Sequence, residues 1–169
     1  MFKSFSVSVL LILSFVVFET AILSNIIIFP AVPDFLLIIS LYLSLHNGRL
    51  FGVSAGFVSG IFLDFLSASP FGLNSLLRTI IGYAAGCFNK TLNTSGIILP
   101  ALLGFIATFL KILILFIISI FFADSVSSYS IFSKAFCFEI ITNSLLTPLV
   151  FMFLNIFRDV ILLNPENVN

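Results

Sequence analysis

Charged residues are scarce in this sequence. Asp, Glu, Lys and Arg make up 8% of its 169 residues, whereas 60% are hydrophobic. Water-soluble domains usually contain roughly a quarter charged residues, so we expect lipid to be the solvent around this chain. The seven basic residues balance the seven acidic ones, which leaves no net charge to attract a nucleic acid. The composition predicts an integral membrane protein that contacts membrane lipids and has no nucleic-acid partner.

Residue types that perform catalysis are also few. The chain has one His, His46, and two Cys residues, Cys87 and Cys137, which both lie within apolar runs. Its four Asp residues are far apart in the sequence. A Ser–His nucleophile, a zinc cluster and a magnesium-binding group of carboxylates are therefore not indicated. We expect no catalytic residue, no metal, no cofactor and no enzymatic activity.

The hydrophobic residues form six runs separated by short polar breaks. These runs are residues 4–23, 35–45, 50–66, 76–88, 97–122 and 131–157. The second and fourth are shorter than the roughly 20 residues that a helix needs to cross a bilayer. The first lacks a small-residue cleavage site, so we interpret it as a retained helix and not a signal peptide. The pattern predicts an all-α fold with about six transmembrane helices in a single transmembrane domain, residues 1–169.

The basic residues predict an orientation. If the N-terminus is cytoplasmic, the inner loops and tails contain four of them: Lys3, Arg49, Lys90 and Arg158. The outer loops then contain none, although Arg78 and Lys134 lie just inside helix starts on that side. Positive charge concentrates on the cytoplasmic side of membrane proteins, so we expect both termini there. Labelling of single cysteines at Asn93 and Ser127 would test this orientation.

The third run contains a glycine row, Gly48, Gly52, Gly56 and Gly60, in which each residue is four positions from the next. Residues four apart share one face of a helix, and Asp64 is the next member of the same face. Small residues in this pattern let two membrane helices approach closely. The row predicts a helix-docking surface, and whether the docked helix belongs to this chain or to another protein stays open.

Five further charged residues fall at membrane depth, where a charge is costly and is expected to have a partner. Asp64 and Arg78 lie on either side of the turn at residues 67–72, so we expect them to form an ion pair. At the rise of about 1.5 Å per residue in an α-helix, we expect Lys111 to lie in the outer half of the bilayer, at the depth of Glu139 and Glu19. These three residues form either a structural ion cluster or the lining of a polar cavity or proton path.

Residues 33–86, "PDFLLIISLYLSLHNGRLFGVSAGFVSGIFLDFLSASPFGLNSLLRTIIGYAAG", resemble the core signature of the rod shape-determining protein MreD family. The matching elements are Pro33 and Asp34 at the start of a short helix, the glycine-spaced helix that ends at Asp64, the turn with Pro70, Gly72 and Asn74, and a Gly-Tyr pair. The resemblance implies a bacterial inner-membrane protein without enzymatic activity. It also implies a fold similar to the S-components of energy-coupling-factor transporters.

Two functions follow from this resemblance. In the first, the chain is a scaffold of the cell-elongation machinery that works with an MreC-like protein, an MreB-like actin homologue, a RodA-like glycosyltransferase and a class B penicillin-binding protein. It would then help to direct lateral peptidoglycan synthesis. In the second, it is the substrate-binding subunit of a vitamin-type transporter, with Lys111, Glu139 and Glu19 in the pocket. S-components commonly carry an Ala-x-x-x-Ala motif on the first helix, and here the first run has only Ala21.

Overall fold

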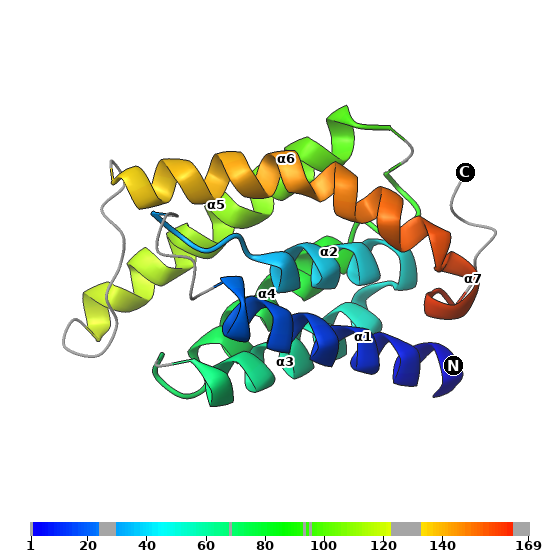
Figure 1. Ribbon diagram of the computed structural model, residues 1–169, viewed down its shortest axis with the longest axis horizontal. Helices are drawn as coiled ribbons and strands as arrows, with labels where there is room; N and C mark the ends of the chain where they lie inside the picture. Colours follow the sequence, from blue (N-terminus) through cyan, green and yellow to red (C-terminus); the bar gives the residue numbers. More distant parts are fainter. Residues whose placement is uncertain are drawn as a thin grey trace.

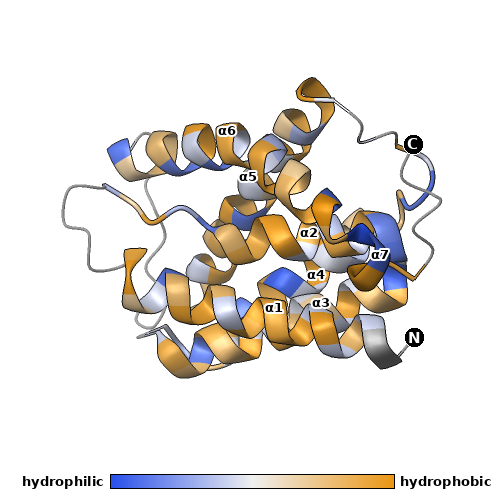
Figure 2. Cartoon of the chain, turned by 45° about the vertical axis from the view of Figure 1, so that its right-hand side comes forward, coloured by the Kyte–Doolittle hydropathy of each residue, from blue (hydrophilic) through white to orange (hydrophobic). Residues whose placement is uncertain are grey.

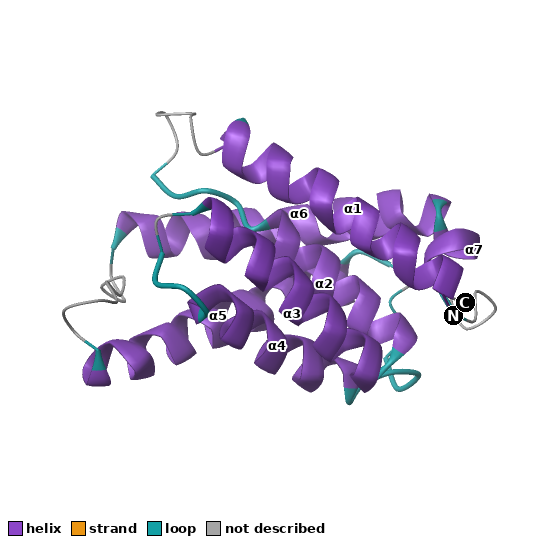
Figure 3. Ribbon diagram, turned by 90° about the horizontal axis from the view of Figure 1, so that it is seen from below, coloured by secondary structure: helices purple, strands orange, loops and turns teal. Residues whose placement is uncertain are grey.

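The computed structural model describes residues 2–23, 30–67, 69–92, 94, 96–122 and 133–163. Every regular element among them is a helix (Figures 1 and 3). The helices are α1 (Phe2–Ala21), α2 (Phe35–Asn47), α3 (Arg49–Leu66), α4 (Leu73–Gly86), α5 (Ile98–Phe121), α6 (Lys134–Ile156) and α7 (Arg158–Ile161). The all-α prediction is confirmed, and the first six helices correspond to the six hydrophobic runs. The loop positions Asn93 and Ser127 lie outside the described residues.

Four of these helices are long and apolar enough to cross a membrane: α1, α3, α5 and α6. α2 and α4 have only 13 and 14 residues. At 1.5 Å per residue, helices of this length extend roughly 20 Å, against about 30 Å for the hydrocarbon core. By length and composition, four of the described helices are candidate membrane spans, and α2 and α4 are short, as the second and fourth hydrophobic runs predict.

The start of α1, the end of α2 and the residues after α7 lie on the same side of the molecule. Near the start of α1, the Ser4 hydroxyl donates to the carbonyl of Leu162, just after α7, at 3.4 Å. The backbone N–H of Leu163 donates to Asn47, the last residue of α2, at 2.7 Å. We call this side of the molecule the α7 end (Figure 1). Glu19, near the end of α1, and Asp34, before α2, lie at the opposite end.

α2 is the central helix of the fold. Its residues 36–45 are all buried, because α1, α3, α4, α5 and α6 pack around it. α2 is hydrophobic around most of its circumference, which is typical of a helix in a protein core or a membrane. Its one aromatic hydroxyl, on Tyr42, donates to Asn155 of α6 at 2.6 Å. Hydrophobic residues also extend along the outward sides of the surrounding helices (Figure 2), as the lipid environment requires.

The glycine row docks α3 against α4 of the same chain. A methyl group at Gly60 would lie 2.5 Å from the backbone nitrogen of Ser75, and one at Gly56 would lie 2.7 Å from the carbonyl carbon of Arg78. α4 contributes the reciprocal small residue, since a methyl group at Gly82 would lie 2.9 Å from the carbonyl carbon of Gly52. The two backbones are therefore in direct contact, and the occupant of this surface is an internal helix.

Gly48, the first member of the predicted row, has a different role. It lies between α2 and α3, outside both helices, with a φ of 90° that L-residues with a side chain rarely adopt. A methyl group there would meet only the Asn89 side chain, at 3.8 Å. The close helix contact is therefore made by three glycines of the row, and Gly48 supplies the reversal of the chain.

Candidate functional site

The main concentration of polar chemistry is a buried charge cluster of five residues from five parts of the chain. Its members are Glu19 of α1, Asp34 before α2, Arg78 of α4, Lys111 of α5 and Glu139 of α6. Four of these residues are at most 7% exposed, and the Lys111 side chain is 17% exposed. The cluster joins helices that lie far apart in the sequence, near the end of the molecule opposite α7.

Asp34 lies at the centre of the charge cluster. One of its carboxylate oxygens accepts from Arg78 Nη2 at 2.6 Å and from the backbone N–H of Leu37 at 2.8 Å. The other oxygen accepts from Lys111 Nζ at 2.7 Å. Asp is a favoured N-cap residue, because its carboxylate satisfies N–H groups in the first helical turn. The same side chain therefore begins α2 and neutralises cations from α4 and α5.

Lys111 has a second carboxylate partner. Its Nζ donates to Glu139 Oε1 at 2.6 Å as well as to Asp34. Of the two glutamates that the sequence places at its depth, Glu139 is thus the one that it contacts. The ammonium group connects α5, α6 and the start of α2. Its removal would leave Glu139 without its cation and Asp34 with Arg78 alone.

Glu19 lies farther from the cations of the charge cluster than Asp34 and Glu139 do. Its Oε2 accepts from the backbone N–H of Leu36 at 3.1 Å. Its Oε1 lies 4.0 Å from Arg78 Nη2, which is too far for a hydrogen bond. The other terminal nitrogen of Arg78, Nη1, is buried without a hydrogen-bond partner among the described residues. Glu19 is therefore the one carboxylate of the charge cluster that makes no close contact with a cation there.

The predicted ion pair between Asp64 and Arg78 is wrong. Asp64 instead accepts five hydrogen bonds from the first residues of α4 and the turn before it. The donors are the backbone N–H groups of Gly72, Asn74 and Ser75, the amide of Asn74 and the hydroxyl of Ser75. These bonds saturate the carboxylate, and Arg78 lies almost one turn further along α4, where it reaches Asp34.

The turn before α4 is organised around this carboxylate. The N–H of Leu73 donates to the carbonyl of Pro70 at 3.1 Å, and Gly72 has a left-handed φ of 92°. The side-chain amide of Asn74 donates to Asp64 and to Ser69. The first N–H groups of a helix have no partner within the helix, and here a side chain of α3 provides one. This explains why α4 begins at Leu73, earlier than the hydrophobic run at 76–88 predicts.

Asn143 is a buried polar residue that the sequence analysis did not single out. It is 0% exposed, accepts from the backbone N–H of Asp34 at 2.9 Å and donates to Thr108 at 3.1 Å. It lies one helical turn after Glu139, and Thr108 lies one turn before Lys111. These i,i+4 and i,i+3 spacings put polar residues on one face of each helix, which is the signal that could have found them.

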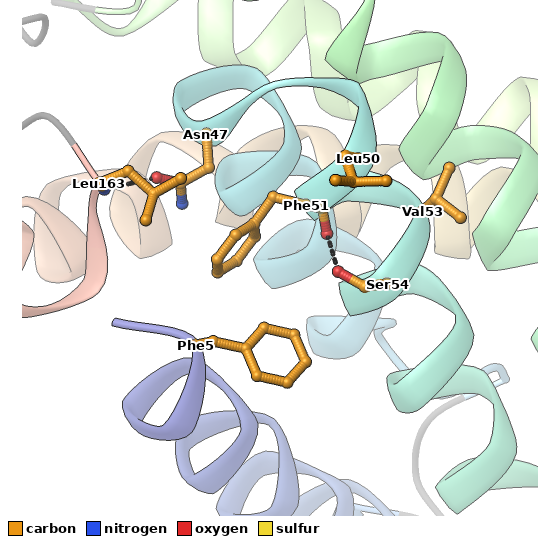
Figure 4. Close-up of a pocket in the computed structure, with 7 residues that line it drawn as sticks. All are labelled: Phe5, Asn47, Leu50, Phe51, Val53, Ser54 and Leu163. Atoms are coloured by element: carbon orange, nitrogen blue, oxygen red, sulfur yellow. Dashed lines mark hydrogen bonds between the residues drawn. The ribbon is translucent and has the colours of Figure 1, made fainter. Parts of the chain in front are cut away.

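A separate cavity of about 550 Å³ lies at the α7 end (Figure 4). Its lining residues are Phe5, Asn47, Leu50, Phe51, Val53, Ser54 and Leu163. Most of these side chains are apolar, and none belongs to the charge cluster. Arg78, Lys111 and Glu139 are therefore engaged with one another or with Asp34 and do not line this cavity.

The arrangement of the charge cluster is suited to fastening helices together. Its closest contacts join carboxylates to cations, and no hydroxyl or thiol nucleophile is among its members. Within the part of the chain that the structure describes, no group of three or more His, Cys, Asp or Glu side chains is arranged to hold a metal ion. These ion pairs connect the start of α2 with α4 and α5, and α5 with α6.

Comparison with protein families identifies one that covers nearly the whole chain. Residues 2–157 match the model described as rod shape-determining protein MreD. This range includes the charge cluster, the glycine row and the turn that Asp64 organises. Searches among curated proteins and among solved structures each found no significant match. The similarity to transporter S-components therefore stays a prediction from the family resemblance.

Proposed function

The chain belongs to the MreD family of rod shape-determining proteins, and from this premise we propose that it is a non-catalytic scaffold of the bacterial cell-elongation machinery. Membership of the family implies a role in rod shape determination. The proposal adds that the chain performs this role by holding partner proteins in the membrane. These partners are an MreC-like protein and, with it, the MreB-like, RodA-like and penicillin-binding proteins that direct lateral peptidoglycan synthesis.

The observation that carries this proposal is the mutual engagement of the buried charges. Asp34 contacts Arg78 and Lys111, and Lys111 contacts Glu139, all at 2.6 to 2.7 Å. A ligand site would need polar groups aimed at an open space, with their hydrogen-bonding capacity available to the ligand. Here the strongest donors and acceptors bind one another, and this favours a role in shaping the helical bundle over the transporter function.

The internal α3–α4 contact restricts where partners bind in this proposal. Gly52, Gly56 and Gly60 are covered by α4, so the glycine row is not a surface for another protein. Partner proteins then contact outward faces of the bundle. In the bacterial inner membrane, both termini lie on the cytoplasmic side, as the distribution of Lys3, Arg49, Lys90 and Arg158 predicts.

The proposal is tested in a rod-shaped bacterium whose own MreD is depleted. The affinity-tagged chain is expressed from a plasmid, cell shape is measured by microscopy, and the purified material is analysed by mass spectrometry. A membrane protein of similar size with the same tag serves as the control. We expect rods to be restored and MreC-like and RodA-like proteins to be recovered with the chain but not with the control.

Two results would contradict the scaffold. One is a failure to recover any cell-wall protein from cells in which the chain restores the rod shape. The other is a tightly bound small molecule that co-purifies with the chain in a 1:1 molar ratio and is lost when Lys111 is changed. That result would support the transporter function. Round cells that contain normal amounts of folded chain would contradict a role in shape determination in this host.

A further inference from the structure

The charges of the cluster do not balance. Glu19, Asp34 and Glu139 contribute three negative charges when ionised, and Arg78 and Lys111 contribute two positive ones. Arg stays protonated in proteins, and Lys111 lies 2.6 and 2.7 Å from two carboxylates, which favours its charged form. Fully ionised, the charge cluster would therefore carry one excess negative charge in a buried site.

The contacts indicate which residue carries this excess. Asp34 and Glu139 each contact a cation at 2.7 Å or less, and their two negative charges balance the two positive charges of Arg78 and Lys111. Glu19 is the fifth member, 7% exposed, with no cation closer than 4.0 Å among the described side chains. An unpaired carboxylate in such surroundings is costly, and the usual response of the group is to neutralise itself by binding a proton.

We infer that Glu19 is a buried proton-binding site, whose side chain is a neutral carboxylic acid that leaves the charge cluster without net charge. The proton comes from the solvent. Oε2 accepts from the Leu36 N–H, which the carbonyl oxygen of a neutral acid can also do, so Oε1 is the oxygen left to carry the proton. This assignment goes beyond the scaffold role, since it makes the stability of the fold depend on a proton bound at Glu19.

The other ionisable groups on elements packed against α1 do not change this balance. Asp34 and Arg78 are the nearest to Glu19, and Lys111 and Glu139 complete the cluster. On α2, Tyr42 forms a hydrogen bond with Asn155, and His46 forms one with Thr94. On α3, Asp64 is held by the start of α4, and Arg49 lies at the α7 end. On α7, Arg158 and Asp159 pair with each other at 3.8 Å, also at that end.

The test compares Glu19→Gln with Asp34→Asn, each purified as the full chain in detergent. Both replace a buried carboxylic group by an amide of nearly the same shape. We expect Glu19→Gln to melt within about 2 °C of the wild type at pH 7, since it replaces one neutral group by another. Asp34→Asn removes the close partner of Arg78 and one partner of Lys111, so its melting temperature should fall by at least about 6 °C.

The pH dependence gives a second readout. Between pH 6 and pH 9, loss of the Glu19 proton places an uncompensated negative charge in the cluster, so the wild type should melt at a lower temperature at pH 9. Glu19→Gln retains every other titratable group of the chain and should lose much of this dependence. In the infrared spectrum at pH 7, a carboxylic-acid C=O band should be present in the wild type and absent from Glu19→Gln.

Three outcomes would overturn the inference. A fall in melting temperature for Glu19→Gln equal to that for Asp34→Asn would mean that Glu19 is ionised and stabilises Arg78. The absence of a carboxylic-acid band from the wild type at pH 7 would mean that no proton is bound, and this spectrum does not depend on any variant folding. A band that persists in Glu19→Gln would place the proton on another residue.

Discussion

Arg78 of α4 donates a hydrogen bond of 2.6 Å to Asp34, a residue 44 positions earlier in the chain. Both side chains are almost completely buried. Asp34 also caps α2 and contacts Lys111, so this pair connects the central helix with two of the helices around it. The position of α2 therefore depends on charges that other helices supply.

Double-mutant cycles should show that Arg78 is coupled to Asp34 and not to Asp64. Arg78→Met should destabilise the chain by about 3 kcal/mol or more, because it removes a buried partner. Its effect should be clearly non-additive with that of Asp34→Asn and additive within about 0.5 kcal/mol with that of Asp64→Asn. Reversible unfolding in detergent provides the free energies. Strong coupling to Asp64 would contradict the contacts described above.

Lys111→Met should lower the amount of folded protein in the membrane, because it leaves Asp34 and Glu139 with one cation fewer. The expected loss is about 3 to 5 kcal/mol, as for other buried pairs that lose one partner. A second change, Glu139→Gln, removes the carboxylate that is then unpaired and should restore part of the loss. Size-exclusion profiles of detergent extracts measure both. If the double variant is as poor as the sum of the single ones, Glu139 does not depend on Lys111.

Gly60→Ala should destabilise the α3–α4 contact although it adds only one methyl group. That group would lie 2.5 Å from the backbone nitrogen of Ser75, so the helices must separate. Overpacking of this kind costs about 1 to 3 kcal/mol and should lower the melting temperature by several degrees. Phe57→Leu, on the exposed side of the same helix, is the matched control. Equal melting temperatures for Gly60→Ala and the control would show that α3 and α4 are not in backbone contact.

Orientation can be measured at two exposed positions that the structure describes. Single cysteines replace Phe71, in the turn between α3 and α4, and Thr91, after α4, in a variant without Cys87 and Cys137. If both termini are cytoplasmic and α2 and α4 also cross the membrane, a membrane-impermeant thiol reagent on intact cells should label Phe71→Cys and not Thr91→Cys. After the cells are permeabilised, both should react. Labelling of Thr91→Cys alone on intact cells would indicate the opposite orientation, with both termini outside the cytoplasm.

Composition and local sequence patterns are enough to establish the class of the protein and most of its helices. Its composition leaves lipid as the solvent, and its hydrophobic runs correspond to the six longest helices of the structure. The four-residue spacing of Gly52, Gly56 and Gly60 also identified a helix-docking face, because helical periodicity is a local property. The motifs of residues 33–86 identified the family. None of these inferences depends on which helices are neighbours in the fold.

Which side chains and helices contact one another follows from the packing of the folded chain. The sequence paired Asp64 with Arg78 because they are close along the chain, but the first N–H groups of α4 occupy Asp64 and the fold brings Asp34 to Arg78. Likewise, the glycine spacing could not show whether α4 or another protein covers the row. Charges and small residues interact over a few ångströms in space. Which groups come that close is set by the packing of helices around α2, and only the folded chain contains that information.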